Sequence, residues 1–162
     1  MQNNLWEDVF KDLAKQKSEL EDRLVSFVLT DTLLFLPDNP RLKDELMRAN
    51  QLLGSHFVMS SGFDVSPENI SQQRYVKVYL QGTEDFKTVF IYLIAMELRS
   101  VLLAILLAEN KIDYKQAFDY AFYEEITEQK QWGVLPEIAD KHSEIKTRLC
   151  ELEKWYEKRS LS

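Results

Sequence analysis

Apolar residues recur along most of the chain with the period of an α-helix. Near the N-terminus, Leu5, Val9 and Leu13 are spaced four apart, and mixed spacings of three and four continue to Val28. Side chains at these spacings share one face of a helix, so the pattern predicts a helix over residues 5–36. Pro37 disfavours the α conformation at the residue before it and is expected to end that helix.

Helix start and stop signals divide the rest of the chain. Asn39-Pro40 resembles an N-cap followed by a proline in the first turn, and Pro136 opens the last helix in the same way. Asp113 with Gln116 resembles a capping box, and Gly133 is a residue that commonly follows a helix. The expected helices cover residues 5–36, 40–60, 67–80, 84–110, 114–131 and 137–158.

These elements predict an all-α protein. We expect a single helical domain over residues 1–162, with about six helices around a long central apolar helix at residues 84–110. Only four glycines and four prolines are present, and this shortage of turn formers favours long helices over many short strands. The one ambiguous segment is residues 75–79, whose tyrosines and valines also fit a strand, although the helix is preferred.

The most apolar segment, residues 89–108, is long enough to cross a bilayer. Glu97 and Arg99 lie at its middle, where each would cost roughly 2.5–3.5 kcal/mol in a membrane. A spacing of two places them on different helix faces, so they do not offset each other by pairing. The segment is therefore interpreted as a core helix, and no membrane span is expected.

Composition narrows the class of protein further. A hydrophobic content of 45% is typical of globular domains, and a net charge of −7 argues against binding to nucleic acid. A single cysteine, Cys150, excludes an internal disulfide, and two distant histidines, His56 and His142, give no zinc spacing. The N-terminus shows neither a secretory signal nor an arginine-rich presequence, which favours a bacterial cytoplasm, with the mitochondrial matrix as the alternative.

No catalytic arrangement emerges from the sequence. The glycines are isolated, so no loop can cradle a phosphate. Glu124, Glu125 and Glu128 suggest a di-metal carboxylate site only superficially, because that chemistry normally uses Glu-x-x-His pairs, which are absent. We expect no enzyme activity, no cofactor and no metal, and interpret these glutamates as an acidic helix face.

Three polar features interrupt the apolar pattern, and each has a structural explanation beside a functional one. Thr30-Asp31-Thr32 lies in an apolar run, where its side chains could bond to another helix end. Arg99-Ser100 lies in the predicted core helix, where the arginine needs an internal carboxylate or an opening to water. Glu124-Glu125 precedes Trp132-Gly133, where the indole could simply cover the core.

Taken in order, these motifs resemble the helical part of the assembly-factor family that chaperones the ATP synthase α subunit, the ATP-twelve chaperones. The resemblance spans roughly residues 9–140. It rests on Thr30-Asp31-Thr32 with Phe35 and Pro40, Ala95 with Leu98-Arg99-Ser100, Lys111-Ile112-Asp113 with Gln116-Ala117, Glu124-Glu125, Trp132-Gly133 and Asp140.

The resemblance implies a chaperone that binds the unassembled α subunit and uses no ATP of its own. It also implies that the acidic residues before Trp132-Gly133 contact the partner. The expected partner-binding residues are Glu124, Glu125, Glu128, Trp132, Gly133 and Asp140. The alternative is a helical interaction module, or a homodimer, with a different partner. The sequence leaves the oligomeric state open, with a monomer favoured.

The chain also departs from the family pattern. Leu36 and Phe122 stand where arginines are usual, and Glu128 stands where a glutamine is usual, so this surface is more acidic. Ala139 replaces a histidine, and residues 49–51 replace a Trp-Asp-Pro motif. The family's β-rich N-terminal domain has no counterpart in these 162 residues.

Overall fold

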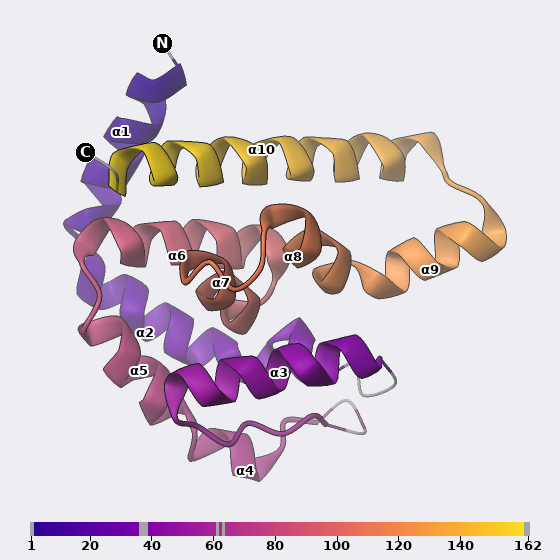
Figure 1. Ribbon diagram of the computed structural model, residues 1–162, viewed down its shortest axis with the longest axis horizontal. Coiled ribbons are helices and arrows are strands. Elements are labelled where there is room, and N and C mark those ends of the chain that lie inside the picture. The colour runs from indigo at the N-terminus through magenta and orange to yellow at the C-terminus, as the bar shows by residue number, and fades with distance from the viewer. Residues whose placement is uncertain (1, 36–38, 61, 63, 161–162) are drawn as a thin grey trace.

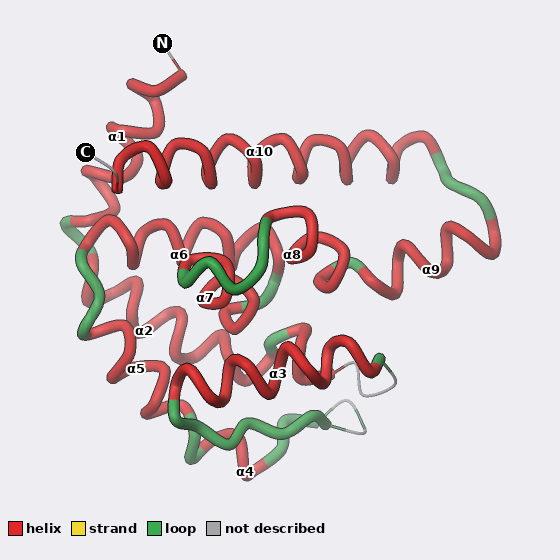
Figure 2. The backbone as a smooth tube through the Cα atoms, in the orientation of Figure 1, coloured by secondary structure: helices red, strands yellow, loops and turns green. Residues whose placement is uncertain are grey.

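The structure, a computed structural model, describes residues 2–35, 39–60, 62 and 64–160. Within these residues the chain is helical with no strand, which confirms the all-α prediction (Figures 1 and 2). The α-helices are α1 Gln2–Ala14, α2 Lys17–Phe27, α3 Pro40–Leu53, α4 Pro67–Ile70, α5 Gln73–Gln81, α6 Asp85–Leu98, α7 Val101–Ala108, α8 Tyr114–Ala121, α9 Tyr123–Trp132 and α10 Pro136–Ser160. Two short 3-10 helices, η1 Val28–Thr30 and η2 Thr32–Phe35, follow α2.

The helices pack around α6 and α7. Every residue of α7 is buried, which is possible because this helix is apolar on all sides. Helices α1, α2 and α10 pack against α6, while α3 and α8 pack against α7, and α5 covers α2 (Figure 1). The buried apolar residues of all these helices belong to one cluster, so the central apolar segment is a core element as predicted.

The expected central helix over residues 84–110 is broken into two. Arg99 adopts a left-handed conformation with φ 58°, which ends α6, and Ser100 caps the start of α7. The break lets the chain turn back so that α7 packs against α6 instead of extending it. The prediction of six helices around one long helix was therefore wrong in this detail, although the apolar segment is central.

Other predicted helices are also divided. The helix expected at residues 5–36 breaks after Ala14 and ends at Phe27, because the segment from Val28 to Phe35 turns toward α7. Residues 67–80 form α4 and α5, which settles the ambiguous segment as helix, and residues 114–131 divide at Phe122. Leu36 and Pro37, the predicted end of the first helix, lie outside the described residues.

Several helix ends follow the local signals. The Asn39 side chain accepts a hydrogen bond from the Arg41 N–H at 3.0 Å, and the capping box of Asp113 and Gln116 is formed. The helix predicted over residues 40–60 instead ends at Leu53, because Gly54 adopts a left-handed conformation with φ 71° that stops it. Among the described residues, none of the helices is long and apolar enough to cross a membrane.

The N-terminus of α7 is held by Asp31, a fully buried carboxylate. One carboxylate oxygen, Oδ1, accepts hydrogen bonds from Ser100 Oγ at 2.5 Å and from the Leu33 N–H at 2.9 Å. The other, Oδ2, accepts one from the Leu102 N–H at 2.8 Å. Ser100 Oγ in turn accepts from the Leu103 N–H at 3.0 Å. Two backbone N–H groups that a buried helix start would otherwise leave unpaired are thus satisfied.

Thr32 completes this junction from the same side. Its backbone N–H and its hydroxyl both donate to the carbonyl of Arg99, at 3.1 Å and 3.0 Å. Two of the three residues in the polar triplet, Asp31 and Thr32, therefore bond to another helix end, which is the structural explanation that the sequence offered. The hydroxyl of Thr30 donates instead to the Phe27 carbonyl. Burial raises the pKa of Asp31 from 3.8 to about 6, although the hydrogen bonds from Leu102, Ser100 and Leu33 act in the opposite direction.

Replacing Asp31 with asparagine tests this junction. In either orientation of the new amide, its NH2 group faces a backbone N–H, that of Leu33 or that of Leu102. We therefore expect the free energy of unfolding to fall by about 1–3 kcal/mol at pH 7. Because the folded pKa of about 6 lies above the unfolded value of 3.8, protonation of Asp31 adds a further stabilisation of the wild type, which is full below 3.8 and is lost as the pH rises through 6. Urea unfolding between these values should therefore show the gap between wild type and variant widening on acidification.

The matched control is Asp22→Asn, which changes an exposed aspartate on α2. Its stability should stay close to that of the wild type at every pH. If the gap for Asp31→Asn is constant or narrows as the pH falls, Asp31 is not a buried carboxylate with a raised pKa.

Candidate partner-binding site

Residues 123–141 form an arm in which no residue is buried. The arm comprises α9, the connection at residues 133–135 and the first turn of α10, and its turn lies at the right-hand edge of Figure 1. The apolar stripe that packs α10 onto the core begins only at His142 and continues through Ile145 and Leu149. In this part of the chain only a few side chains, among them Ile126 and Gln129, are half-buried, and the rest are exposed.

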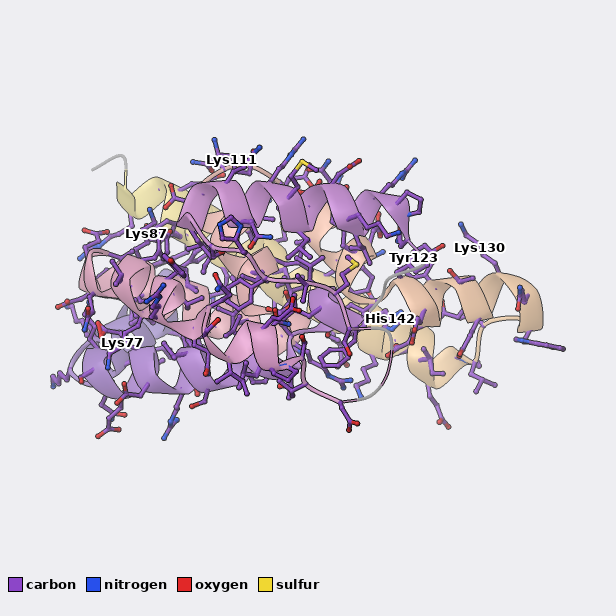
Figure 3. The ribbon with its side chains drawn as sticks, turned by 90° about the horizontal axis from the view of Figure 1, so that it is seen from below. Lys77, Lys87, Lys111, Tyr123, Lys130 and His142 are labelled. Atoms are coloured by element: carbon purple, nitrogen blue, oxygen red, sulfur yellow. The ribbon has the colours of Figure 1, made fainter. Side chains whose placement is uncertain are left out.

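The root of the arm is a small cluster of rings at the junction of α8, α9 and α10. The His142 ring lies edge-on to Phe118, with centroids 5.3 Å apart, and 5.2 Å from the centroid of Phe122. His142 Nε2 lies 2.7 Å from Glu125 Oε2, which ties α10 to the first turn of α9. Figure 3 shows His142 and Tyr123 at this junction and Lys130 farther out on the arm.

One side of α9 carries acidic side chains that lead to a tryptophan. Glu124, Glu128 and Trp132 are spaced four apart, so they follow one another along the same side of the helix. All three are exposed, and Trp132 keeps 84% of its surface accessible. The interpretation in which this indole covers the core is therefore wrong.

The remaining predicted contact residues divide between the root and the far end of the arm. Glu125 is half-exposed but bonded to His142, while Asp140 is exposed on the first turns of α10. Gly133 ends α9 with φ 88°, a conformation that favours glycine. The acidic face and the indole are thus brought together on one arm, whereas their role in binding stays a prediction.

Most of the other motif residues lie in or against the core. Asp31, Thr32 and Ser100 form the junction with α7, and Phe35 packs against the core cluster. Thr30 is exposed, and its hydroxyl donates to the Phe27 carbonyl at 3.1 Å. Arg99 is exposed, so it meets its need for water instead of an internal carboxylate. Asp31, Thr32, Ser100 and Phe35 therefore contribute to the packing of the core.

Sequence reasoning missed two features of this region. Glu97, next to the core helix break, accepts two hydrogen bonds from Arg148 of α10, at 2.7 Å and 3.0 Å. Val134 and Leu135 are exposed at the end of the arm, at 53% and 63%. The exposure of Val134 and Leu135 could have been predicted from the sequence, because they lie between Gly133 and Pro136 and so belong to no predicted helix.

The side chains of the arm are mostly exposed charged and polar groups, with a few exposed apolar ones. No group of three histidine, cysteine, aspartate or glutamate side chains among the described residues could hold a metal ion. The exposed charges and the indole are instead the groups that form protein interfaces.

Solved structures share this fold, whereas no family model and no curated protein matches the sequence. Atp12 from Paracoccus denitrificans is similar with a TM-score of 0.81 and 15% identity over 90% of this chain. A point mutant of P. denitrificans Atp12 gives 0.82 and 14%, also over 90% of this chain. A candidate chaperone from Agrobacterium tumefaciens gives 0.71 and 21% over 89% of this chain.

The chain spans 66% of the length of either Atp12 structure and 58% of the Agrobacterium protein. At these identities the likeness establishes a common fold. At the level of the fold, it confirms the predicted resemblance to the helical part of this chaperone family.

Two variants compare how much the Glu125–His142 contact and the ring cluster each stabilise the root of the arm. Glu125→Gln should lower the free energy of unfolding by less than about 1 kcal/mol, because the carboxylate is half-exposed and the pair is screened by solvent. His142→Ala removes a buried ring from between two others and should cost about 2–3 kcal/mol. Hydrogen exchange should show faster exchange in α9 for His142→Ala, and equal exchange in both variants would contradict the ring cluster as the main attachment.

Proposed function

We propose that this chain is an assembly chaperone for ATP synthase, which binds the unassembled α subunit of the catalytic head until β subunits replace it. The fold shared with Atp12 over 90% of the chain is the observation that carries the proposal. The ordered motifs of the sequence support the same family independently of the coordinates. The bacterial cytoplasm is the proposed place of action, in keeping with the bacterial sources of these structures.

The physical need for such a protein follows from assembly itself. A subunit made for a ring exposes an apolar face before its neighbours arrive, and such faces aggregate. A chaperone without an energy source can cover that face only if its own interface is weaker than the final one. An arm with an acidic side and a few apolar groups suits a contact of this limited strength.

The proposed contact residues are those exposed along the arm. Glu124 and Glu128 would accept hydrogen bonds from basic groups of the α subunit, and Trp132 would be the anchor of the contact. Gly133 and Asp140 extend the surface around the turn. Glu125 contributes by holding α9 to His142, so its replacement would disturb the arm as well as any binding.

The test is capture of purified α subunit, encoded in the same genome, by wild type and by a charge-reversal variant. Glu124→Lys with Glu128→Lys leaves the bond of Glu125 to His142 in place and changes the net charge from −7 to −3. We expect capture to weaken roughly tenfold or more at low salt, since exposed charges are screened at high salt. The circular-dichroism melt should stay unchanged, because both side chains are exposed.

The matched control reverses two other exposed acids at the same spacing. Asp8→Lys with Asp12→Lys lies on α1 and gives the same net charge of −3, so it corrects for non-specific electrostatics. Equal weakening by both variants would remove the arm from the proposal. A wild type that captures no α subunit, but instead itself or another protein, would favour a different helical interaction module.

A further inference from the structure

The end of the arm carries apolar side chains that the fold does not use. Trp132, Val134 and Leu135, here called the arm tip, are 84%, 53% and 63% exposed. With Tyr123 they make up four of the nine large apolar side chains that are exposed in the described part of the chain. Single exposed apolar residues are common on proteins, but a group within one turn marks a contact surface.

The turn does not need these residues for its own stability. Gly133 supplies the positive φ, and Pro136 starts the next helix, so polar residues would serve equally at positions 134 and 135. Helix α9 buries none of its residues, so the tip does not attach it to the core either. The apolar side chains of the tip are therefore available for a contact beyond the described residues.

The charge of the arm indicates the charge of the surface that it would bind. Residues 123–141 contain five acidic residues, Glu124, Glu125, Glu128, Glu137 and Asp140, against two basic ones, Lys130 and Lys141. An acidic surround repels a second copy of the same acidic surface and phosphate-bearing partners, and attracts a surface that carries lysine and arginine. A surface that complements the arm is therefore apolar at its centre and basic at its edge.

We propose that the arm tip inserts as an apolar anchor into a pocket of the partner protein whose rim carries lysine or arginine side chains. This proposal rests on the chaperone function above, and it describes the kind of surface on the α subunit that the arm recognises. Trp132 fills the pocket, with Val134 and Leu135 beside it on the other side of Gly133. The acidic side of α9 pairs with the rim.

The two parts of the arm then act on different steps of binding. Exposed charges speed the encounter and lose their effect as salt is added. Apolar side chains that become fully desolvated slow dissociation, and their contribution is largely independent of salt. The three apolar groups lie within four residues at the connection between α9 and α10, so one pocket can take them together.

The test compares Trp132→Ser with Leu135→Ser against a matched pair, Leu5→Ser with Val78→Ser. The control residues are also exposed apolar side chains, at 64% and 67%, on α1 and α5. Binding of purified α subunit is measured at low and high salt for both variants and for Glu124→Lys with Glu128→Lys. We expect the tip variant to bind roughly 10- to 30-fold more weakly at both salt concentrations, mainly through faster dissociation.

The other outcomes are distinct. If the wild type binds the α subunit and the tip variant binds equally well, the anchor is wrong while the chaperone function stands. If the wild type binds no α subunit, both proposals fall. If sedimentation shows a wild-type dimer that the tip variant dissociates, the tip holds a second copy, which contradicts the proposal. Unchanged melting of both serine variants establishes that a loss of binding is not a loss of folding.

Discussion

The architecture depends on how the buried start of α7 is satisfied. An apolar helix enclosed on all sides leaves its first backbone N–H groups without water, and such groups are costly when unpaired. Asp31 and Ser100 provide the missing acceptors, and the left-handed Arg99 lets the chain reverse between α6 and α7. Because Asp31 comes from the segment after α2, the same contact fixes the N-terminal helices against the core.

The arm differs from the core in its burial. Where α7 buries every side chain, residues 123–141 fully bury none, and the arm is held at its root by the ring cluster around His142, by the contact of Glu125 with His142 and by the half-buried Ile126. A surface with so few internal contacts is free to present charge and apolar area to a partner. The core thus serves as a rigid support, and the arm supplies the proposed recognition surface.

Local signals in the sequence predicted the helical class and several helix ends correctly, because caps such as Asn39 and the pair Asp113–Gln116 act over three residues. The breaks at Arg99 and Phe122 could not be predicted in this way, since apolar periodicity runs through both positions. They are set by packing between distant helices. The acidic face and Trp132 were found from the residues themselves, and their partner-binding role was predicted from the family resemblance. Their exposure, the pairing of Glu125 with His142 and the arm tip required the structure.

Hydrogen–deuterium exchange of the wild type, with and without purified α subunit, tests the central claim most directly. The account predicts slower exchange on binding across residues 123–135, with α3 and α5 unchanged. Protection of α3 or α5 with an unaltered arm would show that the protein binds through another face and would contradict the account.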